Sequence, residues 1–232
     1  MKTNNFFKIS LLTLLIYSLL LLCSCQQSPL EVSEIETIKS LSDADNVEVF
    51  LKNGDFYIDI TNSQIIDKNE QSVFYSVIAK SVYDIAIIRE KVISVKGKQV
   101  VRFISDKEVT SVYEISNREL DVAESAFKNL YGLFRSIFEK DTNQVQNFIS
   151  LKYSSLEKRK NVVDFLFNTF LFPEGYRVNS YGFIFDNIDI ADNSNTSVLK
   201  VFVKYEANSQ LYKYFFYFDP ESSLLYSIDK IE

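Results

Sequence analysis

The stretch SNRELDVAESAFKNLYGLFRSIFEKD, residues 116–141, marks the point at which the hydrophobic pattern of the chain changes. Its apolar residues recur at helical spacing, namely Leu120, Ala123, Phe127, Leu130, Phe134, Ile137 and Phe138. Ser116 followed by Glu119 has the pattern of a capping box, in which a hydroxyl and a carboxylate each satisfy a free backbone N–H. The stretch therefore predicts an amphipathic helix that begins at Ser116.

Two further helices and a run of strands are expected after this stretch. Asp141 with Gln144, and Ser154 with Glu157, repeat the capping pattern and predict a short and a longer helix. Alternation and apolar runs then predict strands at Tyr176–Asn179, Gly182–Ile190, Val198–Glu206, Leu211–Asp219 and Leu224–Ile231. Residues 211–219 are apolar on both faces, which predicts a central strand.

The region before Ser116 shows the alternation that is typical of strands. Asn53-Gly54 lies between two such runs and is the strongest short signal for a hairpin. Further strands are expected at Val73–Ala79, Val82–Arg89, Val92–Lys96, Gln99–Ile104 and Val109–Ile115. Short turns between neighbouring strands predict an antiparallel meander. The fold class is therefore α+β, with an antiparallel β domain over residues 46–115 and an α+β domain over residues 116–232.

The second region resembles the NTF2-like (cystatin-like) superfamily in the order of its elements. The fragments that resemble it are Phe127–Tyr131 with Lys140-Asp141, and the closing pair Tyr214–Asp219 and Leu224–Ile231. The resemblance implies three helices on the concave side of a curved antiparallel sheet, which often enclose a pocket. Aromatic residues that could line it are Tyr131, Phe134, Phe167, Phe183, Tyr205, Tyr214 and Phe216. The alternative is that they form a packed core.

The N-terminus has the features of an export signal. Lys2 and Lys8 precede an apolar segment, residues 9–22, which is shorter than the ~20 residues that a transmembrane helix needs. It ends in Leu22-Cys23-Ser24-Cys25, which resembles the lipobox of bacterial lipoproteins. The resemblance implies a signal peptide over residues 1–24, cleavage after Ser24 and a lipid on Cys25. The alternative is an ordinary cleaved signal or an uncleaved anchor.

Residues 25–45 are expected to be the lipidated cysteine and a tether, which either is a linker throughout or includes one short docked helix. Gln26 is not the Asp that retains many lipoproteins in the inner membrane, so the resemblance favours the outer over the inner membrane. Abundant Phe, Tyr, Ile, Asn and Lys, with few Gly and Pro, resemble lipoproteins of spirochaetal type.

The composition excludes several kinds of chemistry. The chain has no His, and both Cys lie at positions 23 and 25, so no Ser-His-Asp triad or Cys/His zinc site can form in the body. No cofactor, metal site or catalytic residue is expected, and we expect that the protein is not an enzyme. A formal net charge of −6 with scattered basic residues disfavours nucleic acid.

These observations predict a cell-envelope protein attached to the membrane through its lipid, with a non-enzymatic structural or protein-interaction role and an envelope protein as partner. The alternative is a periplasmic carrier or chaperone that binds an apolar ligand, such as a lipid or an acyl chain, in a curved-sheet cavity. Whether the protein faces the periplasm or the cell surface stays open.

Overall fold

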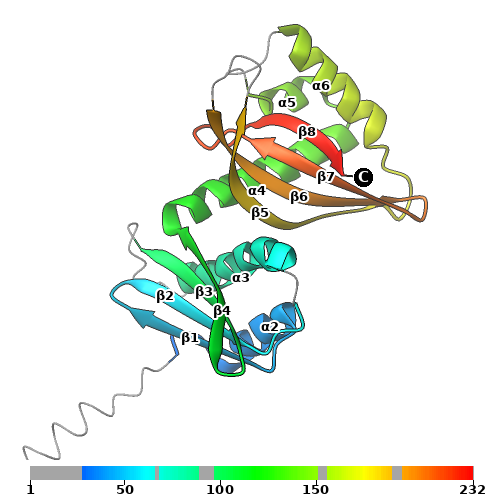
Figure 1. The fold of residues 1–232 in the computed structure, drawn as a ribbon. Coiled ribbons are helices and arrows are strands. Elements are labelled where there is room, and N and C mark those ends of the chain that lie inside the picture. The colour runs from blue at the N-terminus through cyan, green and yellow to red at the C-terminus, as the bar shows by residue number, and fades with distance from the viewer. Residues whose placement is uncertain (1–27, 66–67, 89–96, 151–155, 190–194, 232) are drawn as a thin grey trace, which may run out of the picture.

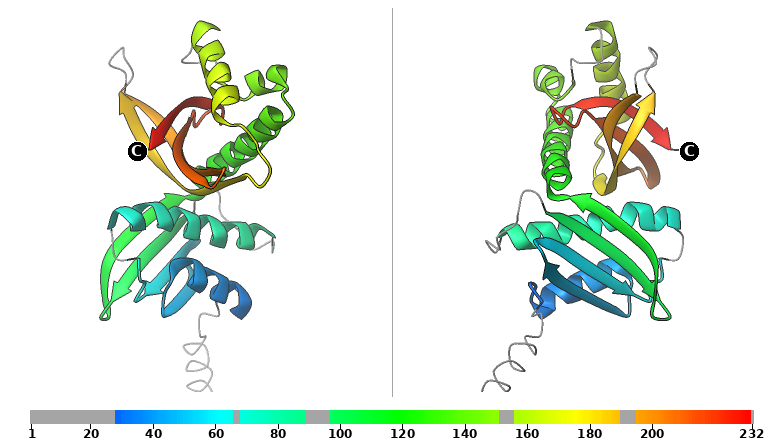
Figure 2. Two further views of the ribbon diagram at one scale, coloured as in Figure 1. Left: turned by 90° about the vertical axis from the view of Figure 1, so that its right-hand side faces the viewer. Right: turned by 60° about the vertical axis from the view of Figure 1, so that its left-hand side comes forward.

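The protein is a mixed α+β structure with two four-stranded sheets. The computed structural model describes residues 28–65, 68–88, 97–150, 156–189 and 195–231. The two sheets lie at opposite ends of the molecule (Figure 1), helix α3 lies between them, and helix α4 runs from the junction along the C-terminal sheet (Figure 2). The expected α+β class is therefore confirmed.

The N-terminal sheet has the strand order β1-β2-β3-β4. Its strands are β1 (Asn46–Lys52), β2 (Asp55–Thr61), β3 (Lys98–Ser105) and β4 (Glu108–Ser116). The expected Asn-Gly hairpin is confirmed, because β1 pairs antiparallel with β2 and Asn53 and Gly54 both have positive φ. Helices α2 (Val32–Ser42) and α3 (Lys68–Ile88) cover the face that carries Val49, Ile58 and Phe103.

The expected antiparallel meander is wrong. Residues 68–88 form the single helix α3, where strands had been expected at Val73–Ala79 and Val82–Arg89. Helix α3 connects β2 to β3, and these two strands pair in parallel. A parallel pair needs a long crossover connection, and α3 provides it. Ile78, Val82 and Ala86 are fully buried at a spacing of four residues, which is the helical period. The strand expected at Val92–Lys96 lies outside the described residues.

The segment expected as a tether contains α2. Leu30 is buried, Ile38 is fully buried, and α2 packs on β1 and α3. Of the two alternatives for residues 25–45, the structure therefore has the docked helix, and the chain belongs to the folded body from Leu30 onward.

Helix α4 (Asn117–Phe138) follows β4 without a linker. Ser116 is both the last residue of β4 and the N-cap of α4, and the expected capping box with Glu119 is confirmed. Helices α5 (Thr142–Asn147) and α6 (Leu156–Thr169) follow, as expected. The predicted apolar face of α4 is buried at Leu120, Leu130 and Ile137, whereas Phe138 is 55% exposed.

The C-terminal sheet is antiparallel throughout, with the order β5-β6-β7-β8. Its strands are β5 (Arg177–Asp189), β6 (Asn195–Ala207), β7 (Gln210–Phe218) and β8 (Leu225–Ile231). Strand β7 lies inside the sheet, so the prediction of a central strand is confirmed. The two strands expected over residues 176–190 are one strand with a bulge between Ser180 and Gly182. The sheet curves around α4 (Figure 2).

Candidate functional site

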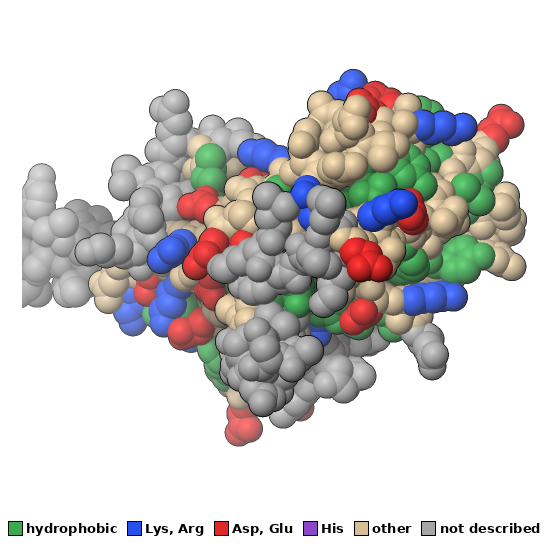
Figure 3. All heavy atoms as spheres, turned by 90° about the horizontal axis from the view of Figure 1, so that it is seen from above, with side chains coloured by type: hydrophobic (Ala, Val, Ile, Leu, Met, Phe, Trp, Pro, Cys, Tyr) green, Lys and Arg blue, Asp and Glu red, His purple; other side chains and the backbone are tan. Residues whose placement is uncertain are grey.

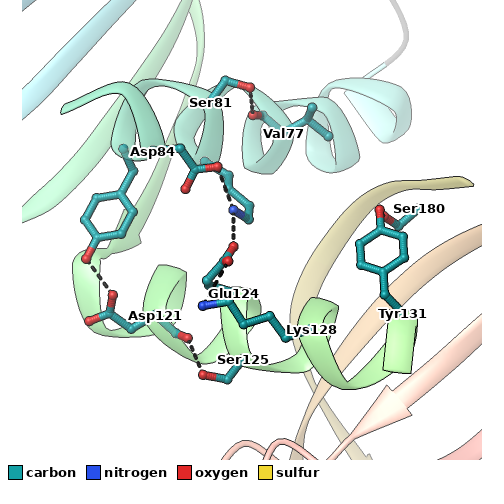
Figure 4. Close-up of polar contacts among 11 residues, drawn as sticks. Val77, Ser81, Asp84, Asp121, Glu124, Ser125, Lys128, Tyr131 and Ser180 are labelled. Atoms are coloured by element: carbon teal, nitrogen blue, oxygen red, sulfur yellow. Dashed lines mark hydrogen bonds and ion pairs between the residues drawn. The ribbon is translucent and has the colours of Figure 1, made fainter. Parts of the chain in front are cut away.

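A cleft lies where α3, α4 and β5 meet, between the N-terminal and the C-terminal sheet. Its volume is about 260 Å³. The lining comprises Val77, Lys80, Ser81 and Asp84 of α3, Glu124, Phe127, Lys128 and Tyr131 of α4, and Ser180, Gly182 and Phe183 of β5. Figure 4 shows α3 and α4 on either side of the cleft, with Tyr131 and Ser180 at one end. An apolar floor with a polar rim is the usual construction of a binding pocket.

The cleft exists because α3 approaches the edge of β5 very closely. A Cβ atom at Gly182 would lie 2.4 Å from Cγ1 of Val73, so only glycine fits there. One residue further, the backbone N–H of Phe183 donates to Oγ of Ser76, at 3.1 Å. Ser76 thereby satisfies a buried edge-strand amide that no neighbouring strand pairs.

Lys80 connects the two helices that form the walls. Its ammonium lies 2.7 Å from a carboxylate oxygen of Asp84 on α3 and 2.6 Å from one of Glu124 on α4. Figure 4 shows Asp84 and Glu124 pointing toward one another across the cleft. The Lys80 side chain is only 15% exposed, and its Nζ lies 5.8 Å from the centre of the Phe127 ring. Lys128 adds a second cation 3.3 Å from Glu124.

The ion pairs favour the charged forms of both Lys80 and Glu124. Burial alone would lower the pKa of Lys80, but its hydrogen bonds to Asp84 and Glu124 outweigh burial and raise the pKa above the ordinary value. The hydrogen bond from Lys80 lowers the pKa of Glu124. A general base or a nucleophilic amine needs the opposite shifts, which bring its pKa toward neutrality. This pair is therefore suited to binding and to holding the helices, and not to proton transfer.

A second contact between the same helices lies near the cleft. The hydroxyl of Tyr83 donates to Asp121, at 2.6 Å, and burial together with this carboxylate raises the pKa of Tyr83. At the other end, the hydroxyl groups of Tyr131 and Ser180 lie 3.3 Å apart. Polar contacts between different elements therefore lie near both ends of the cleft.

The structure divides the seven aromatic residues that were expected to line a pocket. Tyr131 and Phe183 line the cleft. Phe134, Tyr205, Tyr214 and Phe216 are buried around Phe170, with ring centres 5.1 to 5.8 Å from it, and this contact distance is that of a packed aromatic core. Phe167 is half-buried on α6.

Lys80 and Glu124 are 44 residues apart, so no local pattern predicts that they meet. The available signals were local, namely the i, i+4 pairs Lys80–Asp84 and Glu124–Lys128. The Lys80–Asp84 pair lies in the segment for which the sequence predicts strands and which forms α3.

Ser24 and Cys25, the expected cleavage and lipidation residues, lie outside the described residues. Within the described ranges, no group of three or more acidic, His or Cys residues could hold a metal ion. No helix in the same ranges is long and apolar enough to cross a membrane.

No protein-family model, no curated protein and no solved structure matches this chain.

Proposed function

We propose that this chain is a lipid-anchored protein of the bacterial cell envelope with a non-enzymatic, structural or protein-interaction role. The observation that carries the proposal is the lipobox-like Leu22-Cys23-Ser24-Cys25 at the end of an apolar segment. Cleavage after Ser24 removes Lys2 and Lys8 and leaves 23 basic and 31 acidic residues, a net charge of −8. Gln26 favours attachment to the outer membrane.

The chemistry of the cleft supports the non-enzymatic part of the proposal. Lys80 and Glu124 each have a pKa that is shifted away from neutrality, so neither exchanges a proton readily near pH 7. An ion pair of this kind stabilises the approach of α3 and α4.

Nucleic acid is not a proposed partner. The face seen in Figure 3 carries Lys and Arg side chains interspersed with Asp and Glu, without a continuous basic area. Binding to nucleic-acid phosphates requires clustered Lys and Arg side chains, which displace the counterions of the nucleic acid. The net charge of this chain is negative, like that of the phosphates.

The C-terminal half supports an NTF2-like arrangement as part of the proposal, because α4, α5 and α6 precede a curved antiparallel sheet. The second candidate function is that of a carrier, and the apolar floor of Phe127 and Phe183 in the cleft favours it. However, a volume of about 260 Å³ lies below the ~300–1,000 Å³ of common ligand pockets.

The test of this proposal is fatty-acid labelling of the full-length protein in a diderm bacterium. We expect label in the wild type and in Cys23→Ala, and loss of label in Cys25→Ala, because only the cysteine after the cleavage site receives the lipid. Immunoblotting controls for the amount of each protein. Label that persists in Cys25→Ala, or disappears only in Cys23→Ala, would refute the assignment.

A further inference from the structure

We propose that the α2 end of the N-terminal sheet is held next to the lipid surface, and that the C-terminal sheet is directed away from it. This inference rests on the proposed lipidation of Cys25. It goes further because it names which end of the body meets the membrane and which end remains available to a protein partner.

The first observation is that the folded body begins very close to Cys25. Leu30 is 6% exposed, and its backbone N–H donates to Oγ of Ser28, at 3.2 Å. Helix α2 follows directly, and its first turn is capped by Glu34, which accepts from the backbone N–H of Glu31, at 2.7 Å. Ile38 is fully buried in the core of the N-terminal sheet.

The second observation is that the C-terminal end of α2 is tied to the loop after β2. The Ser42 carbonyl accepts from the hydroxyl of Ser63, at 2.6 Å, and the Asp43 carbonyl accepts from the N–H of Gln64, at 2.9 Å. The N–H of Asp45 donates to the Thr61 carbonyl, at 3.0 Å. These bonds fix the C-terminal end of α2 and the buried Leu30 holds its N-terminal end, so α2 cannot serve as a flexible extension of the tether.

The length of chain between Cys25 and the body sets the greatest distance to the bilayer. Five residue steps separate Cys25 from Leu30, and a fully extended chain covers ~3.3–3.6 Å per residue, or about 18 Å in total. A stand-off linker of twenty residues would reach several times further. Leu30, where the folded body begins, must therefore stay within about 18 Å of the anchored cysteine.

The arrangement of the fold converts this distance into an orientation. Figures 1 and 2 show α2 with strands β1–β4 at one end of the molecule, and α6 with strands β5–β8 at the other. A lipid attached next to α2 places the C-terminal unit far from the bilayer. A partner that approaches from the aqueous side would meet α6 and the C-terminal sheet first.

The charge of the α2 end indicates proximity without insertion. Glu31, Glu34 and Glu36 lie at the start of α2, and they are repelled by anionic headgroups. Val32 is 78% exposed, but a single apolar side chain provides little membrane affinity. The lipid surface that fits this end best is therefore zwitterionic, and the tether rather than the protein surface supplies the attachment.

Energy transfer from the body to the bilayer tests the orientation. The mature body contains no Cys apart from Cys25, so one added cysteine can be labelled selectively. Acylated full-chain Glu36→Cys (on α2) and Lys160→Cys (on α6) proteins would each carry a donor dye on zwitterionic vesicles that contain an acceptor lipid. We expect at least about twofold higher transfer from position 36, because the body is tens of ångströms long.

A matched variant separates the tether from direct adhesion. Twenty Gly/Ser residues inserted after Gln27 add a coil of about 25 Å, so transfer from position 36 should fall. Equal transfer from positions 36 and 160, or transfer from position 36 that ignores the insertion, would overturn the inference. Mass spectrometry of the acyl group is a separate readout, because an unacylated Cys25 would refute the proposed function itself.

Discussion

At the residue scale, Lys80 shows how one side chain can join two distant parts of the chain. Its ammonium contacts Asp84 one helical turn away and Glu124 on a different helix. Because the Lys80 side chain is only 15% exposed, solvent screens these contacts less than it screens the surface pair Arg135–Glu139. The contribution to stability should therefore depend on the charge of both partners.

The pH dependence of stability tests this contact. The pKa of Glu124 is lowered in the folded state, so its pairing stabilises the fold above the unfolded pKa, about 4.5, and is lost as the pH falls through the folded value. Glu124 is 40% exposed, so we expect Glu124→Gln to cost about 1 kcal/mol at neutral pH, and less as the pH falls below about 4.5. Urea unfolding at several pH values measures the difference.

Glu139→Gln serves as the matched control, since it removes the acid of an exposed i, i+4 pair. We expect it to change the free energy of unfolding by less than about 0.5 kcal/mol at every pH. A Glu124→Gln deficit that stays constant into acid would contradict an electrostatic role for Lys80.

At the element scale, the structure differs from expectation mainly in α3. Residues 73–88 are rich in Val, Ile, Tyr and Ala, and a short apolar run of such residues is compatible with a strand or with a buried helix. The length of the run and the spacing of Ile78, Val82 and Ala86 were the signals for a helix. Helix α4 was predictable because its polar and apolar faces are distinct and its N-cap is a complete capping box.

The docking of α3 on β5 leads to a prediction for Gly182. Gly182→Ala would place a methyl group 2.4 Å from Val73, and overpacking of this kind should cost about 1–3 kcal/mol of unfolding free energy. Adding Val73→Ala should recover part of the loss, because the two side chains then no longer collide. A double-mutant cycle in urea measures the coupling.

Ser180→Ala, two residues earlier on β5, is the control and should cost less than about 0.5 kcal/mol. Strictly additive effects of Gly182→Ala and Val73→Ala would show that the close approach of α3 to β5 is not what limits position 182.

At the scale of the whole molecule, the two sheets share one hydrophobic core. Ile58 of β2, Val82 of α3, Leu120 of α4 and Leu199 of β6 are all fully buried within a single cluster. Because β4 continues directly into α4 at Ser116, no linker separates the two halves. We therefore expect the protein to unfold as one cooperative unit.

Core truncations in each sheet test this expectation. Ile58→Ala and Leu199→Ala should each cost about 2–5 kcal/mol and should shift the same single transition. Far-ultraviolet circular dichroism and tyrosine fluorescence should give coincident urea curves for both variants. A variant that splits the curve into two steps would contradict a shared core.

Features that depend on neighbouring residues could be predicted from the order of amino acids. The period of 3.6 residues and the capping box specified α4, and the Asn-Gly pair specified the first hairpin. Alternation and apolar runs specified strands β6, β7 and β8. The absence of His likewise limited the available chemistry before any fold was considered. Local sterics and hydrogen bonding act over a few residues, so they can be inferred from the order of residues alone.

Features that depend on contacts between distant residues became visible only in the folded protein. The parallel pairing of β2 with β3 and the meeting of Lys80 with Glu124 each join residues that are more than forty apart in the chain. The same holds for the aromatic residues, since burial around Phe170 distinguished packed core from cleft lining. Burial and long-range pairing depend on which surfaces meet when the chain collapses, and no local pattern encodes that choice.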